Sequence, residues 1–231
     1  SKVALLGYLS ESSNNNELAD SSIVKFPNNQ ILQTVDHIKL FNSIDPFNFG
    51  IISYLHSQND IIAAGGSVHS LNISVGVPFG DGNTEIFYLK SFMKGVEYLS
   101  KFDNASIISG HSYQTFEPGI TINMNGIYEH ESKKTLAREN NLIYLSKPLG
   151  VGYLLAAYFK NSDLLNSQDF NEILSSMKLS NKNASEIAKK HQTKSMTDIS
   201  GFGLASHLGD ICKTSGLTAN IRLDEKLLIN P

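Results

Sequence analysis

Arginine and cysteine are almost missing from this chain of 231 residues. The two arginines are Arg138 and Arg222, so a site that holds phosphate with paired guanidinium groups is nearly excluded. Any phosphate bound here must instead be met by lysine, by backbone N–H groups or by a metal ion. The one cysteine, Cys212, excludes an internal disulfide and a metal cage built from several thiolates.

Long apolar runs and a strong excess of charge are also lacking. No run approaches the roughly 18–20 apolar residues that a membrane-spanning helix needs, and the first residues begin no secretory apolar region. The net charge of -3 argues against nucleic-acid binding through an overall positive charge. With 41% hydrophobic and 18% charged residues, the composition is that of a globular protein. We expect a cytoplasmic protein with neither a membrane nor a nucleic-acid partner.

The familiar nucleotide and hydrolase motifs are absent as well. The sequence contains no G-x-x-x-x-G-K-[ST], no G-x-G-x-x-G after a strand, no G-x-S-x-G, no H-E-x-x-H and no EF-hand loop. The sequence therefore argues against a P-loop, dinucleotide-binding, serine hydrolase or zincin protein.

Hydrophobic periodicity predicts a mixture of strands and helices. Alternating apolar residues predict strands, and apolar residues at helical spacing predict helices. The predicted strands are 22–26, 31–38, 71–77, 105–109, 120–124, 142–145 and 218–223. The predicted helices follow Pro46 and cover 82–102, 151–159, 167–177, 181–190 and a segment that opens at 197–203 and stops near Gly216. Because the elements mix without a strict βαβ rhythm, we expect an α+β fold, loosely α/β, in two layers.

A charged stretch without a strand pattern, at 129–141, predicts a boundary between two domains. We place the N-terminal domain at 1–131 and the C-terminal α+β domain at 132–231.

Isolated aspartates stand at the ends of predicted elements and are the first candidates for chemistry. Asp20 precedes a strand, Asp36 closes one, Asp60 lies near a helix C-terminus and Asp198 precedes a glycine-flanked turn. A carboxylate is mildly unfavourable at a helix C-terminus, so Asp60 suggests a compensating cation. Mg²⁺ takes oxygen ligands and often bridges to substrate phosphates, which several aspartates from distant segments would suit. The alternative for each is a cap, a turn residue or a solvated charge.

Three other residues have both a chemical and a structural interpretation. His111 follows Ser109 and Gly110 at the end of a predicted apolar strand, where a glycine-rich turn could bring backbone N–H groups to a phosphate. The alternative is a partly buried histidine in a turn that ends the strand. Lys147 could supply a point charge for phosphate or be solvated. Cys212 lies on a predicted helix, and we place it in the core without chemistry.

Six ordered sequence blocks resemble the selenophosphate synthetase (selenide, water dikinase) family. The blocks are QTVD at 33–36, DPFNFG at 45–50, NDIIAAGG at 59–66, GHS with EP at 110–112 and 117–118, KPLG at 147–150, and MTDISGFGL with HL at 196–204 and 207–208. Their order and spacing agree from 20 to 223, nearly the whole chain. The wider superfamily contains aminoimidazole ribonucleotide synthetase, hydrogenase maturation proteins and thiamine-phosphate kinase. The His-Ser pair and the MTDISGFGL block favour the selenium branch.

The resemblance implies that ATP and water are used to convert selenide to selenophosphate, AMP and phosphate, with ATP and Mg²⁺ as cofactors. It implies a two-domain fold like that of aminoimidazole ribonucleotide synthetase, with a homodimer formed through the N-terminal sheet and a C-terminal domain cut short in this chain. The residues that it assigns to ATP are Glu17, Leu18, Ala19, Asp36, Asp60, Ser109, Gly110, His111 and Lys147. Those that it assigns to the metal are Asp20, Asp36, Asp60 and Asp198. The Gly-His-Ser segment is expected to reach the nucleotide across the dimer.

The chain departs from the family pattern at several site positions. Ala19 replaces an acidic residue, Ser67 replaces a lysine and Gln114 replaces an aspartate. The family's loop with a cysteine or selenocysteine and a catalytic lysine is expected before Ser1, so no catalytic residue is assigned. Two alternatives therefore stay open, namely an inactive nucleotide-binding or regulatory homologue of the same fold, and another kinase or ligase of the superfamily.

Overall fold

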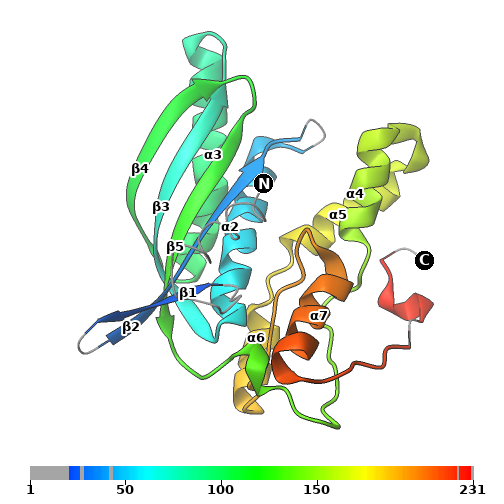
Figure 1. Cartoon of the computed structure of the whole chain (residues 1–231). Helices are drawn as coiled ribbons and strands as arrows, with labels where there is room; N and C mark the ends of the chain where they lie inside the picture. Colours follow the sequence, from blue (N-terminus) through cyan, green and yellow to red (C-terminus); the bar gives the residue numbers. More distant parts are fainter. Residues whose placement is uncertain (1–20, 27–28, 42–43, 223, 230–231) are drawn as a thin grey trace.

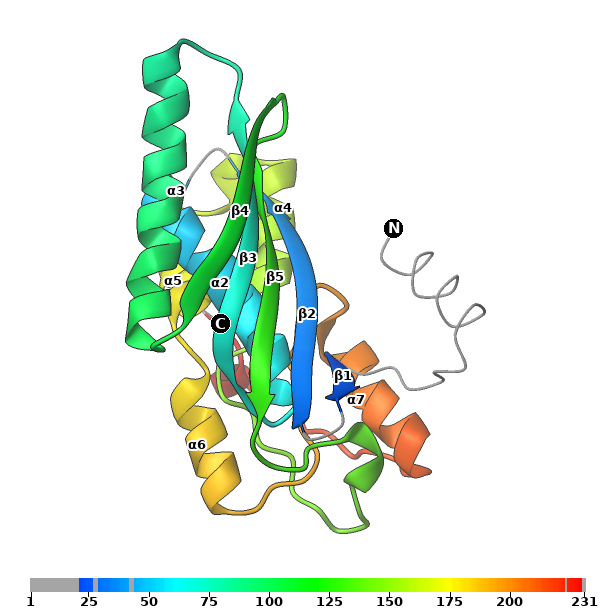
Figure 2. The same cartoon turned by 90° about the vertical axis from the view of Figure 1, so that its left-hand side faces the viewer.

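The computed structural model describes residues 21–26, 29–41, 44–222 and 224–229, and it combines a sheet with helices. The residues described in the first part of the chain form a five-stranded sheet in the order β1-β2-β5-β3-β4. Two long helices, α2 (Pro46–Ala63) and α3 (Gly82–Phe102), lie along one face of this sheet (Figure 1 and Figure 2). The second part is helical and lies beside α2 (Figure 1). The expected α+β architecture in layers is therefore confirmed.

The sheet is antiparallel except for one pair of strands. Its members are β1 (Ser22–Phe26), β2 (Asn29–Lys39), β3 (Gly66–Pro78), β4 (Ser106–Thr115) and β5 (Gly119–Tyr128). β3 and β4 run parallel, and α3 supplies the crossover that a parallel pair requires. β4 is longer than the strand predicted at 105–109, so residues 110–112 lie inside a strand and the expected glycine-rich turn is wrong.

α2 is the interior helix of the first part. It begins as predicted at Pro46, and the side chain of Asp45 accepts a hydrogen bond from Asn48 N at 3.0 Å to cap it. Most of its residues are buried on all sides, whereas α3 buries only a stripe that includes Phe92 and Val96. A helix buried all round must lie between other elements, and α2 is packed between the sheet, α3 and the second part.

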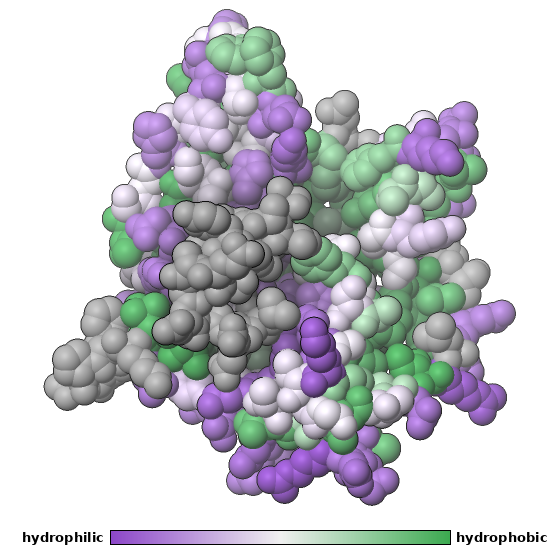
Figure 3. All heavy atoms as spheres, viewed as in Figure 1, coloured by the Kyte–Doolittle hydropathy of each residue, from purple (hydrophilic) through white to green (hydrophobic). Residues whose placement is uncertain are grey.

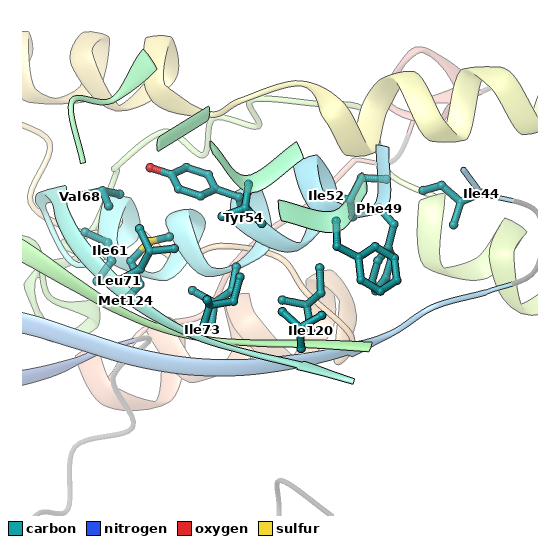
Figure 4. Packing of buried hydrophobic residues seen from close by; sticks show 14 of the residues in the cluster. Ile44, Phe49, Ile52, Tyr54, Ile61, Val68, Leu71, Ile73, Ile120 and Met124 are labelled. Carbon is teal, nitrogen blue, oxygen red and sulfur yellow. The ribbon is translucent and has the colours of Figure 1, made fainter. Parts of the chain in front are cut away.

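The core lies between α2 and the inner face of the sheet (Figure 4). Its largest fully buried side chains are Tyr54, Phe49, Phe92, Leu32, Ile61, Leu71, Ile120, Ile122 and Met124. The members from β3 and β5 alternate along their strands, which is the period-two pattern that predicted those strands.

Two glycines allow α2 and α3 to approach closely. A Cβ on Gly50 would lie 2.3 Å from Phe92 O, and one on Gly95 would lie 2.1 Å from Phe47 O. Both obstacles are backbone atoms of the opposite helix, which cannot move aside as a flexible side chain does. The two helices can therefore pack at this spacing only with glycine at both positions.

Replacing Gly95 with alanine should destabilise the protein by roughly 1–3 kcal/mol, because the helices must separate. The control is Gly209→Ala in the exposed helix α7 (Gly203–Ser215), where a Cβ meets nothing within 4 Å. That change should stabilise by about 0.5–1 kcal/mol through helix propensity alone. Urea unfolding of both variants checks this, and equal effects would contradict the close approach.

The described residues of the second part form four α-helices and three short 3₁₀ turns. The helices are α4 (Val151–Lys160), α5 (Ser167–Lys178), α6 (Lys182–Lys190) and α7, and the turns are η1 (Lys134–Leu136), η2 (Ser162–Leu164) and η3 (Glu225–Leu227). All four predicted helices are confirmed, and α7 ends at Gly216 in the left-handed conformation with φ 68°. Within the described ranges, no helix is long and apolar enough to cross a lipid bilayer.

The two strands predicted in the second part are wrong. Residues 142–145 and the described residues 218–222 form no strand, and an isolated bridge between Leu149 and Leu228 is the nearest approach to a sheet there. A strand needs a partner for its backbone groups. Without one, Leu142 and Tyr144 are 76% and 85% exposed. Figure 3 shows hydrophobic residues on the surface of this part, on the side of α4.

The chain passes from the sheet to the second part along a segment fixed to the end of α2. Glu129 N and His130 N donate to Gly65 O at 3.1 and 3.0 Å, and Ser132 Oγ donates to Ala63 O at 2.8 Å. Gly65 has φ +86°, and a Cβ there would lie 2.2 Å from His130 O. Glycine is therefore required at this junction.

The His130 ring is enclosed in the same junction. Both ring nitrogens are shielded from solvent and have no hydrogen-bond partner among the described residues. Burial lowers the pKa of His130, the Lys189 ammonium lowers it further, and Glu129 opposes the change. The folded chain therefore resists protonation of His130, whereas the unfolded chain binds that proton near the ordinary pKa of 6.5.

We expect the free energy of unfolding to fall as the pH drops below about 6.5, because the unfolded state then binds a proton that the folded state excludes. The carboxyl groups of Glu117 and Glu129 have lowered pKa values, so their stabilisation is lost only below their ordinary value of 4.5. Urea titrations between about pH 7.5 and about pH 5.5 should show a weaker slope in His130→Asn. The exposed His69 gives the control His69→Asn, and an unchanged slope in His130→Asn would contradict the prediction.

Candidate functional site

Asp36 and Asp60 both lie at the contact between β2 and α2. Thr34 and Asp36 lie two residues apart on β2 and are both buried, so they share the face that covers α2. Thr34 Oγ1 donates to Asp60 Oδ2 at 2.6 Å. His56, one turn before Asp60 on α2, places Nε2 3.7 Å from Asp36 Oδ1. Two side chains of the strand thus engage two side chains of the helix.

The chemistry of this pair fits a hard cation. Asp36 and Asp60 are only 9% and 7% exposed, and buried carboxylates need a compensating charge or hydrogen bonds. Mg²⁺ is commonly held by one or two protein carboxylates, with water and phosphate completing its shell. In the described part of the chain, no group of three or more His, Cys, Asp or Glu could hold a metal by itself. The pair therefore suits a cation shared with a phosphate ligand.

The first predicted site segment cannot be placed. Glu17, Leu18, Ala19 and Asp20 lie outside the described residues, so their assignment to ATP and metal stays a prediction.

His111 lies far from this pair within one chain. β4 is separated from β2 by two strands, which at the usual strand spacing is roughly 14 Å between the two strands. Gly110 is paired with Ile73, whose side chain faces the core, so His111 points to the opposite face of the sheet from α2. There its ring stacks on Tyr113, with centroids 6.3 Å apart.

An open groove runs between β4 and α3. It has a volume of about 430 Å³, and Leu89 and Met93 of α3 form one side. Ser109, Gly110 and His111 lie along the other side, so three of the residues predicted to bind ATP are next to one another on an edge strand. Nothing in the described chain brings Asp36 or Asp60 into this groove.

The Lys147 ammonium is bound to the end of a helix. Its Nζ donates to Leu179 O at 2.8 Å and to Ser176 O at 3.3 Å, which satisfies carbonyl groups at the C-terminus of α5. Burial lowers the pKa of Lys147. Lys147, which the sequence predicts to bind phosphate, thus has a structural role in this conformation. A phosphate would have to replace these carbonyl groups as the partner of its ammonium.

Asp198 lies on a loop that is organised by a buried histidine. His207 of α7 is 7% exposed, and its Nε2 accepts a hydrogen bond from Ser200 N at 3.3 Å. The other ring nitrogen, Nδ1, lies 3.4 Å from Thr197 Oγ1. The residues on both sides of Asp198 are therefore held by one ring.

Sequence reasoning missed three residues that shape these positions, namely Thr34, His56 and His207. The signals were present as spacing. Thr34 is two residues from Asp36 on a strand, and His56 is four residues from Asp60 on a helix, so each shares a face with its aspartate. No local pattern indicated that His207 would fold back on the loop at 197–200.

Replacing Thr34 with valine should destabilise the protein by about 1–3 kcal/mol, because the buried Asp60 carboxylate loses one of its donors. Thr121→Val is the matched control, since the Thr121 hydroxyl contacts His37 Nδ1 at 2.8 Å in an exposed pair and should matter by at most about 0.5 kcal/mol. Equal free energies of unfolding for the two variants would show that the Thr34–Asp60 bond contributes nothing.

The chain matches both halves of one family. The AIR synthase related protein N-terminal domain matches residues 18–128, and the AIR synthase related protein C-terminal domain matches residues 138–230.

Curated relatives named selenide, water dikinase are similar to most of the chain. The protein of Caldanaerobacter subterraneus subsp. tengcongensis is 31% identical over 204 residues, which is 86% of this chain and 56% of the relative. The protein of Aeromonas hydrophila is 31% identical over 217 residues, which is 93% of this chain and 61% of the relative. The chain thus spans between half and about three fifths of the length of these relatives.

Solved structures share the fold at low identity. Thiamine monophosphate kinase from Aquifex aeolicus superposes with a TM-score of 0.76 at 19% identity, over 92% of this chain and 72% of that one. Hydrogenase maturation protein HypE in complex with ATP gives a TM-score of 0.64 at 16% identity, over 86% and 59% of the two chains. The models of both halves of the family match this chain in order, and the two solved structures share its fold. The protein therefore belongs to the AIR synthase related family.

Proposed function

We propose that this chain is the nucleotide-binding part of a selenophosphate synthetase, which converts selenide, ATP and water to selenophosphate, AMP and phosphate. The observation that carries the proposal is that Asp36 and Asp60 are both buried at the contact between β2 and α2, where His56 and Thr34 contact them. The 31% identity to selenide, water dikinases supports this reaction over others of the family. The activity is proposed for the whole protein that contains this chain.

The proposed ligands are those that the sequence indicated. Asp36 and Asp60, with Asp20 and Asp198, would hold Mg²⁺, and the ion would neutralise phosphate charge in a chain that has only two arginines. The residues proposed to bind ATP are Glu17, Leu18, Ala19, Asp36, Asp60, Ser109, Gly110, His111 and Lys147. Phosphoryl transfer depends mostly on positioning and charge neutralisation, which such a set can provide.

A homodimer through the sheet is part of the proposal. The face of the sheet away from α2 carries exposed apolar side chains, with Val35 59%, Ile127 49% and Tyr113 43% exposed. His111 lies on this same face, so a partner sheet packed on it would place His111 against the second copy.

We place the boundary between the two domains between residues 131 and 132. We also propose that the protein is located in the cytoplasm.

Two observations favour a second candidate, an inactive nucleotide-binding homologue. The Lys147 ammonium is already engaged with α5, and Gln114, which replaces an aspartate of the family, is bound to Glu85. The product of ATP consumption separates the candidates. Release of AMP in the presence of selenide supports the synthetase, ADP indicates another kinase of the family, and no turnover favours the inactive homologue.

Calorimetry with Mg-ATP on the full-length protein tests the site itself. Asp60→Asn should weaken binding by at least about tenfold, because a buried carboxylate that faces the cation loses its charge. Asp163→Asn is the control, since Asp163 is exposed in η2. Equal affinity of the wild type and Asp60→Asn, with unchanged circular dichroism, would refute the metal role of Asp60.

A further inference from the structure

Asp103 joins three helices and both parts of the chain. It is the residue after the C-terminus of α3, and its side chain is 6% exposed. Tyr54 OH donates to Asp103 Oδ2 at 2.8 Å, and Gln58 Nε2 of the same helix, α2, donates to the same oxygen. Lys182 Nζ, at the start of α6, lies 3.0 Å from Oδ1. One buried carboxylate thus accepts donors from the first and the second part.

The buried Asp103 carboxylate is stabilised by donors that must keep fixed positions around it. A buried carboxylate is costly unless its oxygens are satisfied, and here both oxygens have donors. Burial and the Asp103 charge raise the pKa of Tyr54, so its phenol stays protonated and remains a donor. Lys182 is also placed over the Phe102 ring, 5.1 Å from its centroid. Such a network has a fixed register, whereas apolar surfaces can slide over one another.

The segment 179–182, which ends at Lys182, connects two predicted site elements, and we call it the strap. On one side, Ser180 Oγ donates to Gln58 Oε1 at 2.9 Å and Asn181 Nδ2 donates to Asn59 Oδ1 at 3.0 Å. Gln58 and Asn59 directly precede Asp60 on α2.

On its other side the strap holds the loop that carries Lys147. Ser146 Oγ donates to Asn181 Oδ1 at 2.9 Å, and Lys147 Nζ donates to Leu179 O at 2.8 Å. A continuous chain of hydrogen bonds therefore runs from the loop at 146–147, through the strap, to the end of α2 and to Asp103.

We propose that Asp103 and Lys182 lock the strap against α2 and so set where the Lys147 loop stands relative to the Asp60 end of that helix. Asp103 is a positioning residue, because it acts on the site through Gln58, Lys182 and the strap. The effect on nucleotide rests on the proposed function, but the locking of the strap does not. The ion pair acts on the docking geometry of the two parts more than on overall stability.

Hydrogen exchange of the full-length protein tests the lock. Lys182→Met keeps the apolar stem and removes the charge, and it should speed exchange at least about threefold in segments 144–148 and 179–182, with β3 and β5 unchanged. Lys39→Met is the matched control, because Lys39 and Glu117 form an exposed ion pair at 2.7 Å within the first part. Unchanged exchange in both segments of Lys182→Met would overturn the lock.

A double-mutant cycle identifies the partner. Asp103→Asn removes the charge that Lys182 faces, so the Asp103→Asn/Lys182→Met double variant should exchange no faster than the faster single variant. Additive effects would overturn the pairing. If Asp103→Asn does not fold, Ser180→Ala replaces it and should accelerate exchange in the same two segments.

Mg-ATP affinity of the same variants separates the two proposals. Faster exchange together with at least about threefold weaker binding in Lys182→Met supports positioning of the site. Faster exchange with unchanged affinity overturns the effect on nucleotide. If the wild type itself does not bind Mg-ATP, the proposed function fails, and the lock is decided by exchange alone.

Discussion

The burial of α2 is the constraint on which the remaining structure depends. This helix packs against the sheet on one side, against α3 on another and against α5 and α6 on a third. Its contact with α3 requires glycine at 50 and 95, and its C-terminus holds the segment that leads to the second part. Because one rigid helix makes all these contacts, a shift of α2 would move Asp60, the strap and the linker together.

The polar residues of α2 are as informative as its apolar ones. Ser57, Gln58 and Asp60 are buried in the interior of a helix, where polar groups are costly unless they are bonded. Gln58 forms hydrogen bonds with Asp103 and Ser180 at the junction with the second part, and Asp60 accepts a hydrogen bond from Thr34 on β2. Gln58 and Asp60 therefore contact different neighbours of the helix. They are two positions apart, so their side chains point in different directions from the helix axis.

The sequence predicts the sheet part well because its signals are local. Alternation along β3 and β5, Pro46 after an aspartate cap, and the stripe on α3 each arise from neighbouring residues. The strands expected at 142–145 and 218–223 fail for a physical reason, since a strand exists only with a partner and no strand lies beside them in the described chain. The helices of the second part need no such partner for their backbone, and their prediction succeeds.

The site is only half predictable in the same sense. Asp36 and Asp60 are visible as acidic residues at element ends, but their contacts with His56 and Thr34 join elements that are distant in sequence. His111 was expected in a turn, and the longer pairing of β4 with β3 placed it on a strand face instead. Spacing within one element indicates which residues share a face, whereas the contact between elements depends on packing.

The exposed edge of β4 has a consequence for the handling of the protein. This strand is ten residues long, includes no charged residue, and lies at the end of the described sheet. Natural proteins usually guard such an edge with lysine, proline or a bulge, because its free N–H and C=O groups can pair with any other strand. In the described structure no strand lies outside β4, so a strand from another copy can pair with this edge. Loss of material to aggregates would then set in while the core around α2 is still folded.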